Sequence, residues 1–504
     1  MYIMAIDQGT TGTTVSILDQ AGSLVTKVNQ EFRQIFPKPG WVEHDPEDIW
    51  QSVLQTIKKA LEHSHLKGQQ IAALGITNQR ETVIGWNSET GKSVYHAIVW
   101  QCRRTEPFCL NLKKKGYESK IRKKTGLVID PYFSGTKMNW ILENVPEAKK
   151  LSQQGKLRFG TIDTFLLWRL TGGRSFKTDV SNASRTMLMN LKTLSWDPEL
   201  CRLFKVKEES LAEICDSSGV LGVTENVPGL PHGIPIAGIA GDQQAALFGQ
   251  VAFQAGESKC TFGTGSFLLM NTGPKLVFSQ NKLLTTVAWK LPGEKATYAL
   301  EGGAFICGAA VQWLRDGLGM IQQSSEIEAL AKQVDSSEGV EFVPALTGLG
   351  APYWDSEARG VICGLTRGTT KAHIARATLE AMALQNVEIL LAMQQDLGKK
   401  IPRLKVDGGA SSNNLLMQMQ ANLTGVQVER PELIETTSIG AAYLAGLGVG
   451  FWKSTSDLQK IWKTDRSFQS QMNTNRRSDR LVQWQNAVAK ALSKTRSKAG
   501  KRRS

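Results

Sequence analysis

The chain has 504 residues, of which 41% are hydrophobic and 21% are charged, a balance that is ordinary for a soluble globular protein. This length exceeds what one hydrophobic core serves, so we expect two large domains. No apolar run approaches the ~20 residues of a membrane-spanning helix, and the N-terminus lacks the regions of a signal peptide, which predicts a cytoplasmic protein without membrane insertion.

The formal net charge of +14 would fit a nucleic-acid-binding protein, but seven of the positive charges lie in the last fifteen residues, "KALSKTRSKAGKRRS". A basic tail of this kind is usually solvated. We therefore expect no nucleic acid to be required, with a polyanion-binding or localising role of the tail as the alternative. Seven scattered cysteines form no C-x-x-C pair, which argues against a disulfide framework or a zinc cluster.

Strand and helix signals alternate throughout the chain, which is typical of an α/β fold. Residues 3–6 and 14–18 predict two strands around the Gly- and Thr-rich loop of "DQGTTGTT". A helix follows, with Asp45 as its N-cap and Pro46 in its first turn. The stretch "IAALGITNQRETVIGWN" predicts two short strands on either side of a polar turn at residues 78–81.

Further along the chain, a second pair of strands around a Gly- and Thr-rich turn is predicted. "PIAGIAGDQQAALFGQ" predicts a strand, a corner at Asp242 and a helix, and residues 258–273 predict two strands around a Gly-Thr-Gly turn. A long amphipathic helix, stopped by Gly398, leads into the strand "RLKV" and the loop "DGGASSNN". Two such turns about 250 residues apart predict a duplicated fold with a cleft between the copies, unless they are chance hairpins.

The two Gly/Thr turns contain no Lys or Arg, yet such turns bind phosphate through backbone N–H groups and hydroxyls. Asp7, beside the first turn, offers a carboxylate to Mg²⁺, which prefers carboxylate, water and phosphate oxygens. The pattern therefore indicates a nucleotide-dependent phosphotransfer enzyme. A P-loop at "GWNSETGKS" is excluded, because Gly85 and Gly91 do not have the spacing of that motif, and the stretch predicts a hairpin turn instead.

Phosphoryl transfer to an alcohol also needs a base for the hydroxyl proton. Asp242 is placed for that role at a helix N-terminus, where the helix dipole would hold it ionised; a plain N-cap is the alternative. Arg80 and Glu81 offer donors and acceptors for hydroxyl groups, unless they form an exposed ion pair. Three aromatic residues are candidates for an apolar wall or a hydroxyl contact, with core packing as the alternative: Trp100, Tyr132 and Phe267.

Taken together and in this order, the motifs resemble the FGGY carbohydrate kinases from about residue 3 to residue 470. The signatures shared across that family are "YFSGTKMNWILEN" at 132–144 and "GVICGLTRGTTKAHIARATLE" at 360–380. Other stretches, such as "PKPGWVEHDPEDIW", "GITNQRET", "NASRTMLMN" and "PALTGLGAPYWD", are similar to its glycerol kinases. The resemblance implies two actin-like, ribonuclease H-like domains, duplicated around a cleft, and phosphorylation of glycerol by ATP to sn-glycerol 3-phosphate.

The resemblance also implies roles for individual residues. Those matched to the glycerol hydroxyls are Arg80, Glu81, Tyr132, Asp242 and Gln243. Those matched to the apolar wall are Trp100 and Phe267. Asp242 matches the general base, and Asp7 the residue that organises Mg²⁺ through water. The positions matched to the nucleotide are Thr10, Thr11, Gly12, Thr14, Thr264, Gly308, Gln312, Gly409 and Asn413.

Two stretches depart from the family pattern. The first loop of the family continues to an Arg that reaches toward the phosphates, where this chain has Thr14, as in loops of xylulose-type kinases. Residues 226–238 lack the Arg-containing loop that binds fructose 1,6-bisphosphate in some bacterial members, so we do not expect inhibition by that sugar. His232 in this stretch lacks the flanks of a histidine that other bacteria phosphorylate.

The expected domains are residues 1–250, with the glycerol site and the first phosphate turn, and residues 251–470, with the nucleotide site, followed by a C-terminal helix and basic tail at 471–504. The resemblance implies a homodimer or homotetramer. Two alternatives are a kinase of the same family for a pentulose or longer polyol, and an actin-like or chaperone-like ATP-driven binding protein. The second alternative gives no reason for a polyol cluster of Arg80, Glu81 and Asp242.

Overall fold

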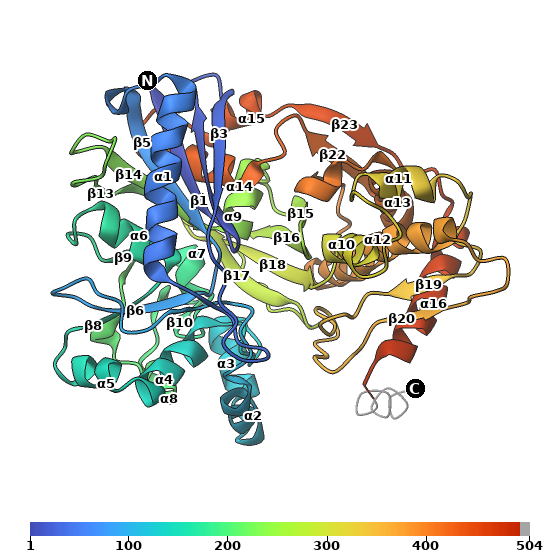
Figure 1. Cartoon of the computed structure of the whole chain (residues 1–504), viewed down its shortest axis with the longest axis horizontal. Coiled ribbons are helices and arrows are strands. Elements are labelled where there is room, and N and C mark those ends of the chain that lie inside the picture. The colour runs from blue at the N-terminus through green and yellow to red at the C-terminus, as the bar shows by residue number, and fades with distance from the viewer. Residues whose placement is uncertain (494–504) are drawn as a thin grey trace.

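The computed structural model describes residues 1–493 and contains two α/β halves that lie side by side, each built on a mixed sheet (Figure 1). The strands of the first sheet are β1 Tyr2–Gln8, β2 Gly12–Leu18, β3 Leu24–Glu31, β5 Ile71–Asn78, β13 Ser218–Val223 and β14 Pro235–Gly241. Their order is β13-β14-β5-β1-β2-β3. The strands of the second sheet are β15 Ser258–Phe262, β16 Ser266–Gly273, β17 Leu284–Trp289, β18 Thr297–Ala304, β21 Arg403–Asp407, β22 Gln427–Pro431 and β23 Thr464–Phe468. Their order is β17-β18-β16-β15-β21-β22-β23.

The same arrangement of strands occurs in both sheets. In the first sheet β1 forms an antiparallel hairpin with β2 and pairs in parallel with β5. In the second sheet β15 forms an antiparallel hairpin with β16 and pairs in parallel with β21. The duplicated α/β architecture expected from the two Gly/Thr turns is therefore confirmed.

The remaining elements surround the two sheets. In the first half these are β4 Glu43–His44, α1 Pro46–Ser64, η1 Gly68–Gln70, β6 Val83–Asn87, β7 Ala97–Ile98, α2 Glu106–Lys114, α3 Glu118–Thr125, α4 Ser134–Asn144, α5 Pro146–Gln153, β8 Leu157–Thr161, α6 Ile162–Leu170, β9 Lys177–Asp179, α7 Val180–Ala183, β10 Met189–Asn190, β11 Ser195–Trp196, α8 Pro198–Phe204, η2 Glu208–Ser210, β12 Glu213–Cys215 and α9 Asp242–Gly249. In the second half they are α10 Gly308–Asp316, α11 Glu326–Ala331, β19 Glu341–Val343, β20 Val361–Cys363, α12 Lys371–Leu397, η3 Gly409–Ser412, α13 Asn414–Thr424, α14 Thr436–Gly448, α15 Thr455–Ile461 and α16 Thr474–Ala491.

Helix α14 comes from the second half of the chain but packs on the first sheet, against β14, β5 and β1, and on α9. Two glycines allow this close approach: a Cβ atom on Gly75 would lie 2.2 Å from the carbonyl oxygen of Ala441, and one on Gly440 would lie 1.8 Å from that of Ala245. Helix α9 in turn contacts β15 and β16 of the second sheet. The two halves are therefore joined through α9 and α14, and one apolar cluster extends across both.

Several of the predicted elements are confirmed. Asp45 caps α1 by accepting a hydrogen bond of 2.9 Å from the backbone N–H of Glu47. The "GWNSETGKS" stretch is a hairpin turn, in which Asn87 donates to the carbonyl oxygen of Lys92 over 3.0 Å. The prediction that α12 is amphipathic is wrong. Elements α11, α13, β16 and β19 pack around this helix, so that residues on most of its surface are buried.

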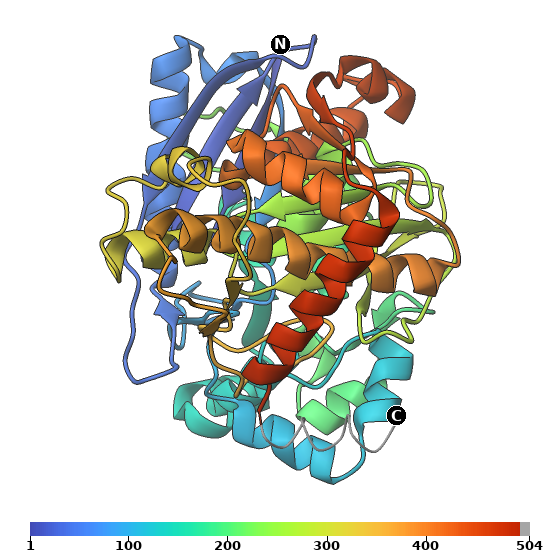
Figure 2. The same cartoon turned by 90° about the vertical axis from the view of Figure 1, so that its right-hand side faces the viewer.

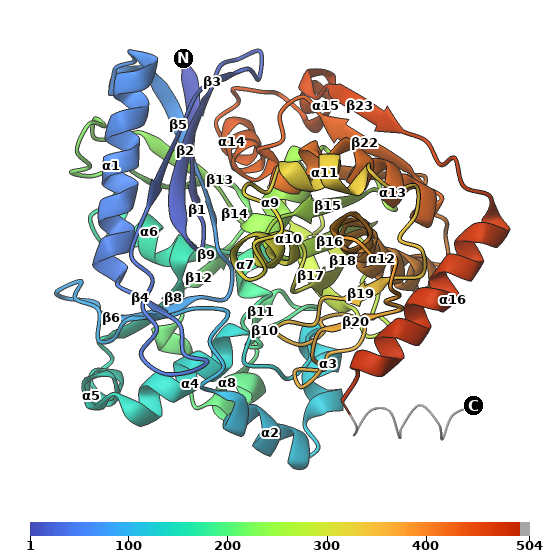
Figure 3. The same cartoon turned by 45° about the vertical axis from the view of Figure 1, so that its right-hand side comes forward.

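Helix α16 crosses the outer face of the second half (Figure 2) and lies on the side away from the first half (Figure 3). The chain just after α16 is attached to the loop between β19 and β20, since the backbone N–H of Ser493 donates to Asp355 Oδ2 over 2.9 Å. Residues 494–504, which hold most of the basic tail, lie outside the described part of the chain. No helix among residues 1–493 is long and apolar enough to cross a bilayer, and all seven cysteines are free thiols.

Candidate active site

Three strand ends bring the predicted catalytic residues together at one edge of the first sheet. Strand β5 is parallel to both β1 and β14, so the carboxyl ends of all three strands lie at the same edge. Asp7 is near the end of β1, Arg80 follows β5, and Asp242 follows β14. Open α/β sheets place their ligand sites at this edge.

Arg80 is the centre of the site, and its two terminal nitrogens donate four hydrogen bonds within the protein. Its Nε contacts Asp242 Oδ1 over 3.0 Å. Nη1 donates to Glu301 Oε2 over 2.6 Å and to Gln244 Oε1 over 3.1 Å. Nη2 donates to Glu301 Oε1 over 2.9 Å and to the Tyr132 hydroxyl over 3.3 Å. A Cβ atom at position 241 would lie 2.7 Å from the Arg80 side chain, so glycine is needed there for this approach.

Glu301 and Arg185 complete the cluster, and the sequence reading gave a role to neither. Glu301 lies on β18 of the second sheet and reaches Arg80 across the junction of the two halves. Arg185 donates to Glu81 Oε1 over 2.6 Å and to Glu301 Oε1 over 2.9 Å. All four of these side chains are at most 2% exposed, so Arg80 and Glu81 do not form the exposed ion pair considered above.

The charges of this cluster shift the pKa values of its carboxyl groups in different directions. Burial alone would raise the pKa of Glu301, but Arg185 and Arg80 outweigh it and hold this pKa at about 2. Burial raises the pKa of Glu81 and that of Asp242, although Arg80 opposes both shifts. The helix N-terminus therefore does not outweigh burial, and the pKa of Asp242 lies above that of an exposed aspartate.

Helix α7 holds two of the three strand ends in place. Asn182 and Asn78, at the end of β5, exchange two amide hydrogen bonds of 3.0 Å each. The Ser181 hydroxyl accepts from the backbone N–H of Gly241, the residue before Asp242, over 2.9 Å. This short helix therefore fixes the backbone that leads into the corner at Asp242.

The three predicted aromatic residues lie together beside this cluster. The ring centroid of Trp100 is 5.6 Å from that of Tyr132 and 6.5 Å from that of Phe267. Trp100 Nε1 donates to the Thr10 hydroxyl in the first Gly/Thr turn over 2.9 Å. Trp100 and Phe267 are partly exposed, and the Asp242 side chain is 31% exposed, which leaves these groups accessible to a small ligand.

The first Gly/Thr turn is tight, since the backbone N–H of Gly9 donates to the carbonyl oxygen of Gly12 over 2.9 Å. Thr10 and Thr11 lie in the turn, whereas Gly12 and Thr14 belong to β2. Thr14 is directly opposite Asp7, and its hydroxyl accepts from Asn29 on β3 over 3.0 Å.

Asp7 lies where its charge is poorly compensated. Burial and the charges of Asp242 and Glu435 raise its pKa to about 8, while Lys27, which is ion-paired with Glu435, opposes this shift. An excess of carboxylates at this point fits a divalent cation. No three Asp, Glu, His or Cys side chains among residues 1–493 gather as a ligand group, so phosphate and water would supply the other ligands of Mg²⁺.

The residues matched to the nucleotide also come together in the second half. The carbonyl oxygen of Thr264 accepts from the backbone of Cys307 over 2.8 Å, and Gly308 at the start of α10 donates to Gly263 over 3.0 Å. Gln312 is one turn further along α10. A Cβ atom on Gly408 would lie 2.7 Å from the carbonyl oxygen of Phe262, which places the next loop beside this turn. That loop contains the last two matched positions: Gly409 in η3, and Asn413, which caps α13.

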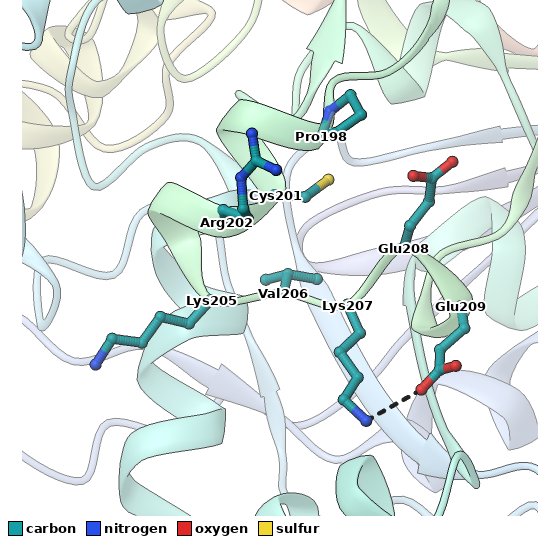
Figure 4. A pocket seen from close by; sticks show the side chains of 8 residues that line it. All are labelled: Pro198, Cys201, Arg202, Lys205, Val206, Lys207, Glu208 and Glu209. Atoms are coloured by element: carbon teal, nitrogen blue, oxygen red, sulfur yellow. Dashed lines mark hydrogen bonds and ion pairs between the residues drawn. The ribbon is translucent and has the colours of Figure 1, made fainter.

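A broad surface depression of about 650 Å³ lies elsewhere, between α8 and η2 (Figure 4). Two of its lysines are already paired with acidic residues: Lys205 with Glu143 over 2.7 Å and Lys207 with Glu209 over 3.2 Å. None of the predicted site residues lines it.

Comparison with known proteins agrees with this geometry. The N-terminal domain of the FGGY family of carbohydrate kinases matches residues 2–249, and the C-terminal domain of that family matches residues 258–449. The chain therefore belongs to the FGGY family of carbohydrate kinases, and the predicted family and fold are confirmed.

The relatives point to one group within this family. The chain is 62% identical to a glycerol kinase of Bdellovibrio bacteriovorus over 97% of this chain and 98% of that protein. It is 54% identical to glycerol kinase 2 of Thermotoga maritima over 97% and 99% of the two chains. The crystal structure of Plasmodium falciparum glycerol kinase with ADP superposes with a TM-score of 0.91 at 38% identity, covering 98% of each chain. A xylulose kinase from Lactobacillus acidophilus, at 24% identity and a TM-score of 0.86 over 97% of each chain, shares the fold.

The buried cluster predicts how stability depends on Glu301. Glu301→Gln should lower the free energy of unfolding at neutral pH by about 3–5 kcal/mol, because it leaves two buried guanidinium groups without their shared counter-charge. The pKa of Glu301, at about 2, is below the ordinary 4.5, so its contribution is complete above pH 4.5 and is lost as the pH falls toward 2. Urea unfolding of the variant should therefore lack this part of the acid dependence.

Glu209→Gln is the matched control, since this glutamate is in the exposed pair with Lys207 (Figure 4). It should cost less than about 1 kcal/mol. Equal losses in the two variants, or an unchanged acid dependence in Glu301→Gln, would contradict the role given to the cluster.

Proposed function

We propose that this chain is a glycerol kinase, which transfers the γ-phosphoryl group of ATP to glycerol and forms sn-glycerol 3-phosphate. The observation that carries the proposal is the contact between Arg80 and the partly exposed Asp242, next to Glu81 and the aromatic residues. The near full-length similarity to glycerol kinases supports it. A cytoplasmic location and assembly into homodimers or homotetramers are part of the proposal.

Asp242 acts as the general base in this proposal. Its Oδ1 is bound by Arg80 Nε over 3.0 Å and by the backbone N–H of Gln243 over 2.7 Å, which leaves Oδ2 to take a hydroxyl proton. A raised pKa makes this carboxylate a stronger base than an exposed aspartate. The deprotonated hydroxyl oxygen then attacks the γ-phosphorus of ATP, the bond from that phosphorus to the β,γ-bridging oxygen breaks, and ADP leaves with this oxygen. The backbone N–H groups of the turns stabilise the charge of the transferring group.

The acceptor alcohol is held by polar groups on one side and by aromatic rings on the other. Trp100 and Phe267 contact its carbon atoms, while Arg80, Glu81 and Tyr132 bind its hydroxyls. All four N–H groups on Nη1 and Nη2 of Arg80 already donate to the protein, so a hydroxyl bound by either nitrogen must replace an existing bond. The 3.3 Å bond to Tyr132 is the longest hydrogen bond that this guanidinium makes.

The nucleotide occupies the space between the two Gly/Thr turns in this proposal. Thr10, Thr11, Gly12 and Thr14 contact its phosphates from the first half. The second-half contacts are Thr264, Gly308, Gln312, Gly409 and Asn413. Asp7 holds Mg²⁺ through water, and the ion supplies positive charge to the phosphate oxygens when it is bound.

Asp242→Asn should lose most of the turnover while the affinity for glycerol stays within about tenfold, because the amide keeps the shape but takes up no proton. Steady-state kinetics and calorimetric titration of glycerol measure the two effects separately. Asp45→Asn, which keeps an N-cap of α1, is the control and should leave turnover unchanged. Near-normal turnover of Asp242→Asn would contradict the assignment.

Thr14→Arg should lower the KM for ATP, because Thr14 lies directly opposite Asp7 and a guanidinium there adds charge beside the phosphates. Thr14→Gln, of intermediate size and without charge, is the control. An unchanged KM for ATP would mean that another cation already supplies this charge.

An ADP-release assay with several alcohols tests the proposed substrate. Glycerol should give the highest kcat/KM in a series with xylulose, ribulose and erythritol, and ADP release without alcohol should be slow. Preference for a pentulose would make the chain a different kinase of this family, and alcohol-independent hydrolysis would favour an ATP-driven binding protein. Fructose 1,6-bisphosphate should not inhibit the reaction with glycerol.

A further inference from the structure

Lys259 is a buried cation that the function proposed above does not use. It lies on β15 of the second sheet, its side chain is fully buried, and it faces α9, the helix that begins with Asp242. Its ammonium group donates to Gln243 Oε1 and, over 2.7 Å, to the Thr261 hydroxyl. A buried ammonium that costs desolvation free energy is retained only where its contacts compensate that cost.

The contact with Lys259 decides which way the Gln243 amide points. Lys259 Nζ donates to Gln243 Oε1, so the oxygen of the Gln243 amide faces Lys259. The amide nitrogen, with its two N–H groups, then faces away from Lys259. Gln243 is the neighbour of Asp242 and donates its backbone N–H to that carboxylate over 2.7 Å.

We propose that Lys259 is a positioning residue that holds the Gln243 amide so that it presents an N–H donor to a hydroxyl oxygen of the acceptor alcohol. This inference rests on the proposed function. With Asp242 as acceptor and Gln243 as donor side by side, the site binds one hydroxyl that gives up a proton and a second hydroxyl that accepts a hydrogen bond. A substrate with two hydroxyl groups close together satisfies both.

The surroundings of Lys259 fix it relative to both ends of α9. Asp407 pairs with Thr261 across β15 and β21, and its Oδ2 accepts from Gln250 Nε2 over 2.8 Å. Gln250 directly follows α9, and its carbonyl oxygen accepts from Lys405 over 2.7 Å. The second sheet thus holds the beginning of the helix through Lys259 and its end through Asp407 and Lys405.

The charges around Lys259 favour its ammonium form but do not fully offset burial. Burial, the largest effect, lowers the pKa of Lys259, whereas the carboxylates of Asp407 and Asp242 oppose that shift and Arg80 adds to it. Lys259 in turn opposes the upward shift of the pKa of Asp242. The lysine therefore contributes to the site by orientation and by charge.

Gln243→Glu tests the orientation directly. The glutamate keeps an oxygen toward Lys259 but replaces the N–H donor by an acceptor. We expect a melting temperature at or above that of the wild type, a KM for glycerol raised about tenfold, and a KM for ATP within about twofold. Gln243→Leu, which removes both groups, should raise the KM for glycerol by a similar factor.

A double-mutant cycle tests the part played by Lys259. Lys259→Met should raise the KM for glycerol about tenfold in the wild-type protein. When Gln243→Leu is already present, the same substitution should raise the KM for glycerol by no more than about twofold. Lys259→Arg, which retains a donor, should recover part of the wild-type KM. If Lys259→Met fails to fold, the comparison of Gln243→Glu with Gln243→Leu still decides the orientation.

Two results would overturn the inference while the wild type still phosphorylates glycerol. One is a wild-type KM for glycerol in Gln243→Glu together with a raised KM in Gln243→Leu, which would mean that the amide oxygen faces the substrate. The other is a KM for glycerol in the double variant that is raised by the product of the two single-variant factors, which would mean that Lys259 and Gln243 act independently. Failure of the wild type to release ADP with glycerol would instead overturn the proposed function.

Discussion

The carboxylate of Glu301, on the second sheet, is shared by two guanidinium groups from the first half of the chain, Arg80 and Arg185. This contact fixes the plane of the Arg80 guanidinium, and that plane sets the position of the Arg80 Nε that contacts Asp242. The proposed acceptor site is therefore assembled only where the two halves meet. A separate first half would contain Arg80 and Asp242 but not the group that orients them.

The distribution of charge at this junction explains the chemistry assigned to Asp242. The positive charges of Arg80 and Arg185 stabilise the ionised form of Glu301, so the pKa of Glu301 is low. The pKa values of Glu81 and Asp242 remain raised, because burial has the larger effect on these two groups. A general base works best when its pKa lies near the operating pH. Within one cluster, Glu301 thus serves structure and Asp242 is left as the more basic group.

The sequence was sufficient to predict the parts of the site that follow from local pattern. Asp7, Arg80 and Asp242 each stand at the end of an apolar strand, and the edge of a parallel sheet brings such residues together. Glu301 and Lys259 were not predicted, because each is a single charged residue inside a strand and the local pattern does not show which side chains it meets. The same limit applies to the fold: the two hairpins were predictable from their turns, but the packing of α14 on the opposite half was not.

The crystal structure of the complex with glycerol tests the account most directly. Glycerol should lie between Asp242 and the rings of Trp100 and Phe267, with one terminal hydroxyl on Asp242 Oδ2. Both bonds from Arg80 to Glu301 should be retained, while the bond from Arg80 to Tyr132 is exchanged for one to the ligand. Glycerol bound away from Asp242, or an Arg80 side chain released from Glu301, would contradict it.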